Sequence, residues 1–178
     1  MHSERWRANL ALRLDRGRAT KDSSALSGLE DVRRTVRGRL QLSHTLDDGW
    51  SASAAASVDL LGRGGGTVFD LGAGRSFPLA PRASWNVGFN ASAADRRYMQ
   101  SYFGVSAAQA VDTGYAPYAP SSGWRDLSVS LGARSEFGER WIGYVGVSQA
   151  WLLGPARSSP LSQQPSSWAV SGGLAWRF

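Results

Sequence analysis

The stretch WRANLALRLD (residues 6–15) alternates apolar side chains with mostly polar or charged ones. Tryptophan, alanine and leucine fill the even positions, whereas Arg7, Asn9, Arg13 and Asp15 stand between them. Successive side chains of a β-strand point to opposite faces of its sheet. This period of two therefore predicts a strand with one apolar face and one charged face.

The same period recurs in seven further segments, at 35–43, 50–60, 67–77, 85–92, 126–137, 141–151 and 168–178. Two are irregular: Arg75 interrupts the apolar face of 67–77, and Ile142, Tyr144 and Gln149 break the pattern in 141–151. Short connections join several of the segments, as antiparallel neighbours allow. We predict an all-β, antiparallel barrel of about eight strands, in a single domain over residues 1–178.

The apolar face could point inward, as in a soluble barrel or sandwich, or outward toward lipid. The tryptophans favour the second arrangement, because all eight lie at or within two residues of a predicted strand end: Trp6, Trp50, Trp85, Trp124, Trp141, Trp151, Trp168 and Trp176. Indole rings prefer the two interfaces of a membrane, where outer-membrane barrels carry aromatic girdles. We therefore predict a transmembrane β-barrel in the bacterial outer membrane, with its apolar face toward lipid.

The connections differ at the two predicted ends of the barrel. At one end they are short, at 46–49, 78–82 and 138–140, whereas the other end has 15–33, 95–123 and 153–167 beside the short 61–66. Outer-membrane barrels have short periplasmic turns and longer external loops. We therefore expect the first end to face the periplasm.

Composition narrows the function classes. The 178 residues include no cysteine and only two histidines, so we expect no metal or cofactor. The net charge is +6, yet the arginines are dispersed, which disfavours nucleic-acid binding. No apolar run reaches the length of a transmembrane helix, and the first residues do not form a signal peptide.

The polar face of the predicted strands carries an excess of arginine over acidic residues. A charge inside a barrel needs a partner or water. We interpret these residues as a paired, hydrated network in the lumen, with a selective anion path as the alternative. The predicted network comprises Arg7, Arg13, Arg37, Arg39, Asp59, Asp70, Asp126, Arg134 and Glu136, with Arg177 on the same face.

Two other motifs invite a chemical interpretation. The glycine-rich GRGGGT (62–67) lacks the lysine and helix start of a phosphate-binding loop, so we predict a loop tip. His44 could serve a serine hydrolase of the lipid-modifying type only if it faced a serine and an acid. Its position on the apolar face predicts an interfacial imidazole instead, and we expect no enzyme.

Several stretches resemble the MipA/OmpV family of outer-membrane proteins. They are LRLDRGR (12–18), LSGLEDV (26–32), YMQSYFGVSAAQA (98–110), YAPY (115–118) and LLGPARSSPL (152–161), with a terminal strand that ends in phenylalanine. The matching positions in the predicted outer loops are Tyr98, Gln100, Ser101, Tyr102, Phe103, Gly104, Val105, Tyr118, Gly123, Gly154, Ser159 and Pro160. This sequence differs from the family at Pro155, Arg157 and Ser158, where family members usually have a segment that contains aspartate.

The resemblance implies a larger barrel, with a signal peptide and further strands upstream of this sequence, so we expect the chain to be N-terminally truncated. It also implies a non-enzymatic scaffold between the outer membrane and peptidoglycan-remodelling enzymes, with a lytic transglycosylase and a penicillin-binding protein as partners. A small-solute pore and a surface adhesin are the alternatives.

Two further predictions concern the C-terminal ending and residues 98–111. Leu174, Trp176 and Phe178 form an alternating C-terminal ending of the kind that the barrel-assembly machinery recognises. Tyr98–Phe103 is expected to continue the strand before it, and Gly104–Val111 to form a short helical turn over the barrel mouth.

Overall fold

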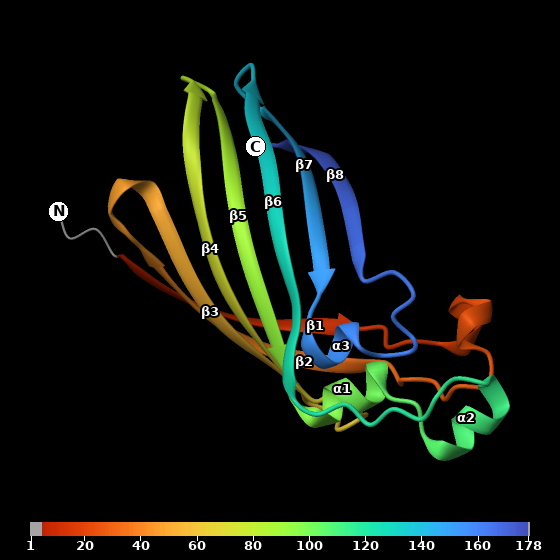
Figure 1. The fold of residues 1–178 in the computed structure, drawn as a ribbon. Coiled ribbons are helices and arrows are strands. Elements are labelled where there is room, and N and C mark those ends of the chain that lie inside the picture. The colour runs from red at the N-terminus through yellow and green to blue at the C-terminus, as the bar shows by residue number, and fades with distance from the viewer. Residues whose placement is uncertain (1–4, 178) are drawn as a thin grey trace.

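The computed structural model describes residues 5–177, apart from the side chains of residues 22 and 24. No helix in this range is long and apolar enough to cross a membrane. Figure 1 shows the strands β1–β8, the helices α1–α3 and, unlabelled, the 3₁₀ turns η1–η3. Their bounds are β1 Trp6–Asp15, η1 Thr20–Asp22, η2 Ser24–Leu26, β2 Thr35–Thr45, η3 Asp47–Gly49, β3 Trp50–Asp59, β4 Thr67–Ala80, β5 Ala83–Ala94, α1 Arg96–Phe103, α2 Ala107–Thr113, β6 Gly123–Phe137, β7 Trp141–Leu152, α3 Gly154–Arg157 and β8 Ser166–Trp176.

Residues 5–177 form one eight-stranded sheet in which each strand pairs antiparallel with the next, in the order β1 to β8. The prediction of an all-β, antiparallel fold is confirmed, and each predicted segment is a strand. The sheet curls into a half-barrel (Figure 1), and within the described residues β1 and β8 do not pair with each other. The sheet therefore has two edges, β1 and β8.

The apolar face of the sheet is its exposed face. Leu10 is 82% exposed, and Leu40, Phe69 and Leu131 are exposed in the neighbouring parts of the sheet, whereas Arg37 on the opposite face is only 6% exposed. This arrangement excludes a soluble barrel with an apolar interior, because that fold buries its apolar side chains. The polar residues of the alternating pattern therefore lie on the inner face of the sheet.

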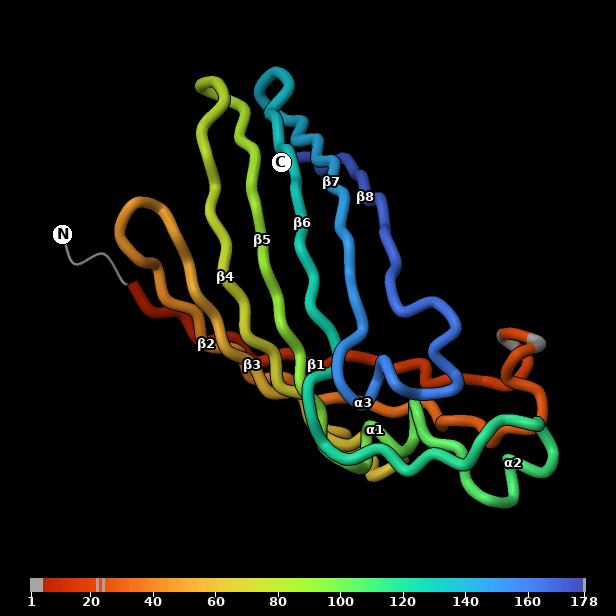
Figure 2. The backbone as a smooth tube through the Cα atoms, viewed as in Figure 1, coloured from red at the N-terminus to blue at the C-terminus, as the bar shows by residue number. Residues whose placement is uncertain are grey.

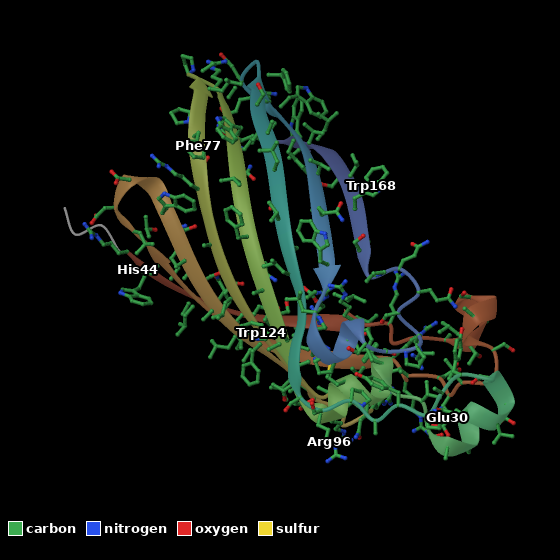
Figure 3. The ribbon with its side chains drawn as sticks, viewed as in Figure 1. Glu30, His44, Phe77, Arg96, Trp124 and Trp168 are labelled. Carbon is green, nitrogen blue, oxygen red and sulfur yellow. The ribbon has the colours of Figure 1, made fainter. Side chains whose placement is uncertain are left out.

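Aromatic side chains gather toward both ends of the outer face. Trp6 packs against His44 with ring centroids 4.3 Å apart, and Trp141 meets Trp176 at 4.7 Å. Figure 3 shows Phe77 near one end of the sheet and Trp124 near the other. Indole and phenyl rings at both rims are the arrangement that the double girdle predicts.

The two ends of the sheet have different connections, as predicted. The turn end is defined by 46–49, 81–82 and 138–140, and it is also where β1 begins and β8 ends (Figure 2). The mouth end holds α1, α2, α3, η1 and η2 in its longer connections (Figure 1).

The expectation for Tyr98–Phe103 was wrong, because Arg96–Phe103 is the helix α1 rather than a continuation of β5. Asp95 ends the strand: its carboxylate accepts hydrogen bonds from the backbone N–H of Tyr98 at 2.7 Å and of Thr67 at 2.8 Å. An acceptor at this position satisfies a free N–H of the first turn and so starts the helix.

The helical turn expected at Gly104–Val111 lies further along the chain. Gly104 ends α1, and Val105 pairs with Tyr118 in an isolated bridge. Helix α2 then begins at Ala107, where Ser106 and Gln109 form a capping box.

Candidate functional site

Helix α1 is held against the inner face of the sheet by a small apolar cluster. Met99 has no exposed surface and packs with Val68 of β4, Ala94 of β5 and Ala156 of α3. Tyr98, Phe103 and Leu152 extend this cluster. The helix is therefore a fixed part of the mouth end.

Hydrogen bonds between distant segments anchor the same region. Ser159 donates its hydroxyl to the Phe103 carbonyl at 2.6 Å, and Arg18 donates to the Tyr102 carbonyl at 2.8 Å. The Tyr118 hydroxyl donates to the Pro155 carbonyl at 2.8 Å. We call this assembly of α1, the 105/118 bridge and α3 the stopper.

The stopper brings together the residues that carry the family resemblance. Gly123 passes so close to Pro155 that an added Cβ would lie 3.1 Å from its ring, and Gly154 begins α3 with φ +45°. Pro160 is half-buried after Ser159. At the mouth end, a hollow of about 600 Å³ is lined by residues that include Gln100, Ser101, Gly104, Val105 and Tyr118.

Two tyrosines of α1 face the arginines of the sheet. The rings of Tyr98 and Tyr102 stack with centroids 4.4 Å apart. The guanidinium carbons of Arg37 and Arg125 lie 5.3 and 5.4 Å from the Tyr98 ring centroid, close enough for cation–π attraction. Arg125 also donates to the Tyr98 hydroxyl at 3.2 Å.

Tyr102 joins the helix to the first strand. Its hydroxyl donates to both carboxylate oxygens of Asp15 at 3.1 Å. Burial first, and then the negative charge of Asp15, raise the pKa of Tyr102 well above its usual value. The phenol therefore stays protonated and keeps its role as a donor.

Most of the predicted charge network meets beneath these tyrosines. Arg37 pairs with Asp15 at 2.7 Å, and Arg39 forms a close ion pair with Asp70. Asp59 serves another purpose, because it accepts the Thr35 hydroxyl and the Gly65 N–H. It thereby fixes the β3–β4 connection, whose glycines form the predicted loop tip.

The remaining members of the predicted network lie elsewhere. Arg134 pairs with Glu136 at 2.8 Å near the turn end, and Arg177 approaches the same carboxylate at 3.4 Å. Arg7 makes no ion pair among the described residues. The charges on the polar face therefore form two groups, one at each end of the sheet.

Two members of the mouth group were missed from the sequence. Asp15 continues the alternation of β1 on the face of Arg13, so the pattern itself could have identified it. Arg125 lies at a β-bulge, where Ser92 opposes Asp126 but Ala93 opposes Trp124. A bulge re-aims a side chain, and Arg125 forms a close ion pair with Asp126.

These side chains surround a cavity of about 490 Å³ on the inner face, which we call the arginine cavity. Its polar lining consists of Arg13, Arg16, Arg37, Arg39 and Arg125, with Asp15, Asp70, Ser57, Tyr98 and Tyr102. Guanidinium groups bind oxyanions through paired N–H donors. The cavity is therefore suited to bind an anion.

Below the arginine cavity, the inner face toward the turn end has many small side chains and a few large ones. A second hollow of about 450 Å³ lies there, lined on this face by Asn86, Ser130, Gly132, Gly146, Ser148 and Ser171, among others. Asn86 and Gly132 are direct cross-strand partners, as are Gly88 and Ser130. The larger inward side chains of this half, Arg134, Ile142 and Tyr144, line the same hollow without filling it.

The other predicted positions have simpler surroundings. His44 stacks on Trp6 on the apolar face, and its Nδ1 has no hydrogen-bond partner. No group of three or more metal-ligating side chains occurs within the described residues. Leu174 and Trp176 are exposed on the outer face, whereas Phe178 lies outside the described residues.

The sequence matches the model of a known protein family. A family model described as MltA-interacting protein MipA matches residues 1–178. No curated protein matches the sequence.

Proposed function

Because the chain belongs to the MltA-interacting protein MipA family, we propose that it is an outer-membrane β-barrel protein that binds a lytic transglycosylase of the MltA type. In this role it connects the outer membrane to an enzyme that remodels peptidoglycan. The family match over residues 1–178 is the observation that carries the proposal.

The outer face supports the membrane part of the proposal. Leucine, valine and phenylalanine side chains cover it, and they are exposed from β1 to β8. Soluble proteins rarely expose an apolar surface of this extent. Lipid tails would cover the surface without the cost of contact with water.

The turn end is the proposed docking side for the transglycosylase. Short turns face the periplasm in outer-membrane barrels, and peptidoglycan lies in that compartment. The stopper occupies the opposite end, so we place the partner against 46–49, 81–82 and 138–140.

We also propose that the protein acts by binding and not by catalysis. His44, the histidine that a hydrolase would need, packs against Trp6 on the apolar face and not with an inward-facing acid. A lipid hydrolase activity that disappears in His44→Ala would contradict this part. A solute pore and a surface adhesin stay predictions.

Binding can be measured with the folded chain in detergent and an immobilised MltA-type transglycosylase. We expect retention of the wild type and weaker retention of Glu139→Lys, which reverses a charge in the β6–β7 turn. Asp112→Lys on the exposed face of α2 is the matched control at the mouth end, and it should bind like the wild type. Failure of the folded wild type to bind would refute the proposed partner, and addition of a penicillin-binding protein would test the second predicted partner.

The membrane part has a separate test. Leu71 faces outward in the middle of β4, and Asn90 faces inward at the same depth, opposite Gly72. In lipid vesicles we expect Leu71→Arg to reduce the free energy of unfolding by about 2–4 kcal/mol, the cost of an arginine near the bilayer midplane. Asn90→Arg should cost much less, and equal costs would contradict the proposed lipid-facing side.

A further inference from the structure

We propose that the arginine cavity is a binding site for a phosphate group. This inference goes beyond the proposed function, because no part of it requires a transglycosylase. It rests on the arrangement of charges that β1, β2, β4 and β6 place beneath α1.

The first observation is a pair of like charges in direct opposition. Arg13 of β1 and Arg37 of β2 are cross-strand partners, and both line the cavity. Like charges directly opposite each other destabilise a sheet. A bound anion between or beside them would remove this cost.

The second observation is that the available carboxylates are already used. Asp15 pairs with Arg37, Asp70 with Arg39 and Asp126 with Arg125. Arg13 and Arg16 also line the cavity, and neither makes an ion pair within the part of the chain that the structure describes. The site therefore has two arginines more than the carboxylates that pair there.

The donor arrangement identifies the class of ligand. Arg37 is fully engaged, because it donates to Asp15 and to backbone carbonyls of 57, 65 and 66. Arg13 and Arg16 contribute two guanidinium forks without such partners. Two forks that line one cavity fit a group with several anionic oxygens, and arginine binds phosphate in this bidentate manner.

The tyrosines complete the site on the side of α1. Tyr98 and Tyr102 form one wall of the cavity, and their hydroxyls already bond to Arg125 and Asp15. They fix these charges in place and leave Arg13 and Arg16 to meet the ligand. The phosphate could come from a soluble molecule or from a lipid headgroup.

The test uses the full chain folded in neutral detergent and isothermal titration calorimetry. Inorganic pyrophosphate is the soluble probe, and mixed micelles containing phosphatidic acid are the lipid probe. We expect at least one probe to bind, and Arg13→Gln/Arg16→Gln to weaken that binding by about tenfold or more, as the loss of charge-assisted hydrogen bonds implies. Binding of pyrophosphate identifies a soluble source, and binding of the micelles alone identifies a lipid headgroup.

Arg5→Gln/Arg7→Gln is the matched control, because it also removes two arginine charges, at the turn end, where Arg5 forms an exposed pair with Asp47. It should bind as tightly as the wild type. An equal loss in this control would reveal a general charge effect and overturn the site, as would no binding of either probe or unchanged binding by Arg13→Gln/Arg16→Gln.

Thermal unfolding separates a binding role from a structural one. Without phosphate, Arg13→Gln should unfold at a higher temperature than the wild type, because it removes one of two opposed like charges. The bound probe should raise the unfolding temperature of the wild type much more than that of the variant. The inference would be contradicted if Arg13→Gln unfolded at a lower temperature than the wild type without the probe, and if the probe raised both unfolding temperatures by the same amount.

Discussion

The two halves of the inner face are built in different ways. The mouth half contains large side chains, close ion pairs and a helix whose Met99 is fully buried. The turn half has serine, glycine and asparagine beside a few larger side chains such as Tyr144, around a hollow of about 450 Å³. The strands share one alternating pattern along their whole length, whereas a packed helix fills the interior at one end only.

This difference has a physical cause in the partners available to each half. At the mouth, the 95–123 connection returns to the inner face and supplies Tyr98, Met99 and Tyr102 as partners for the strands. At the turn end the connections are too short to return. The inward side chains there are mostly small or, like Arg134 and Tyr144, partly exposed, so they can stay hydrated.

The largest expected effect tests the ion pairs of the two halves. Arg37 is buried and paired with Asp15, whereas Arg134 is about half exposed and paired with Glu136. We expect Arg37→Met to reduce the free energy of unfolding by about 3–5 kcal/mol, because it removes the hydrogen bonds of a buried guanidinium and leaves the partly buried Asp15 carboxylate without its ionic partner. Arg134→Met should cost no more than about 1 kcal/mol, the usual worth of an exposed pair.

Urea titration of the folded chain in detergent measures both variants. Similar losses would show that the two halves are equally well packed. That result would contradict the distinction between a filled mouth and an open turn end.

The next prediction compares apolar side chains. Met99→Ala removes the centre of the stopper and should cost about 3 kcal/mol, through lost burial and the cavity that remains. Ile142 is a half-buried inward residue near the turn end, and Ile142→Ala should cost about 1 kcal/mol, in proportion to the smaller area it buries. The same urea titration applies, and a greater loss from Ile142→Ala would reverse the comparison.

Much of the sheet could be predicted because alternation depends on local sequence. Each strand from β1 to β8 overlaps a predicted segment. Which residues share a face of the sheet follows from which positions are apolar. The tryptophans identified the two ends. These features need no information about distant contacts.

The stopper could not be predicted in the same way. Tyr98 and Met99 occur in a segment whose composition suits a strand, since aromatic residues favour β-structure. The helix forms because Asp95 caps it and because Val68 and Ala156 bury Met99, contacts that lie far apart in the sequence. Arg125 was missed because a bulge, and not the alternation, determines its direction.

A smaller effect is expected at the start of α1. Asp95→Ala removes two hydrogen bonds to backbone N–H groups, and it should cost about 1–2 kcal/mol, as the loss of an N-cap does. Asp112→Ala, on the exposed face of α2, removes the same charge without a cap and should be neutral. Hydrogen exchange of the α1 amides checks the mechanism, because faster exchange there should accompany the loss in Asp95→Ala alone.

The smallest effect is expected in the turn half itself. Asn86 is exposed on the inner face and lies beside Gly132, its cross-strand partner. Asn86→Ala removes side-chain atoms that hydrated surroundings can replace, so the free energy of unfolding should change by no more than about 0.5 kcal/mol, as at other surface positions. Urea titration at matched detergent concentration gives this value. A loss of 2 kcal/mol or more, on the scale of about 1–3 kcal/mol for an unsatisfied buried polar group, would mean that the asparagine supports the sheet, and that the turn half is packed as specifically as the mouth.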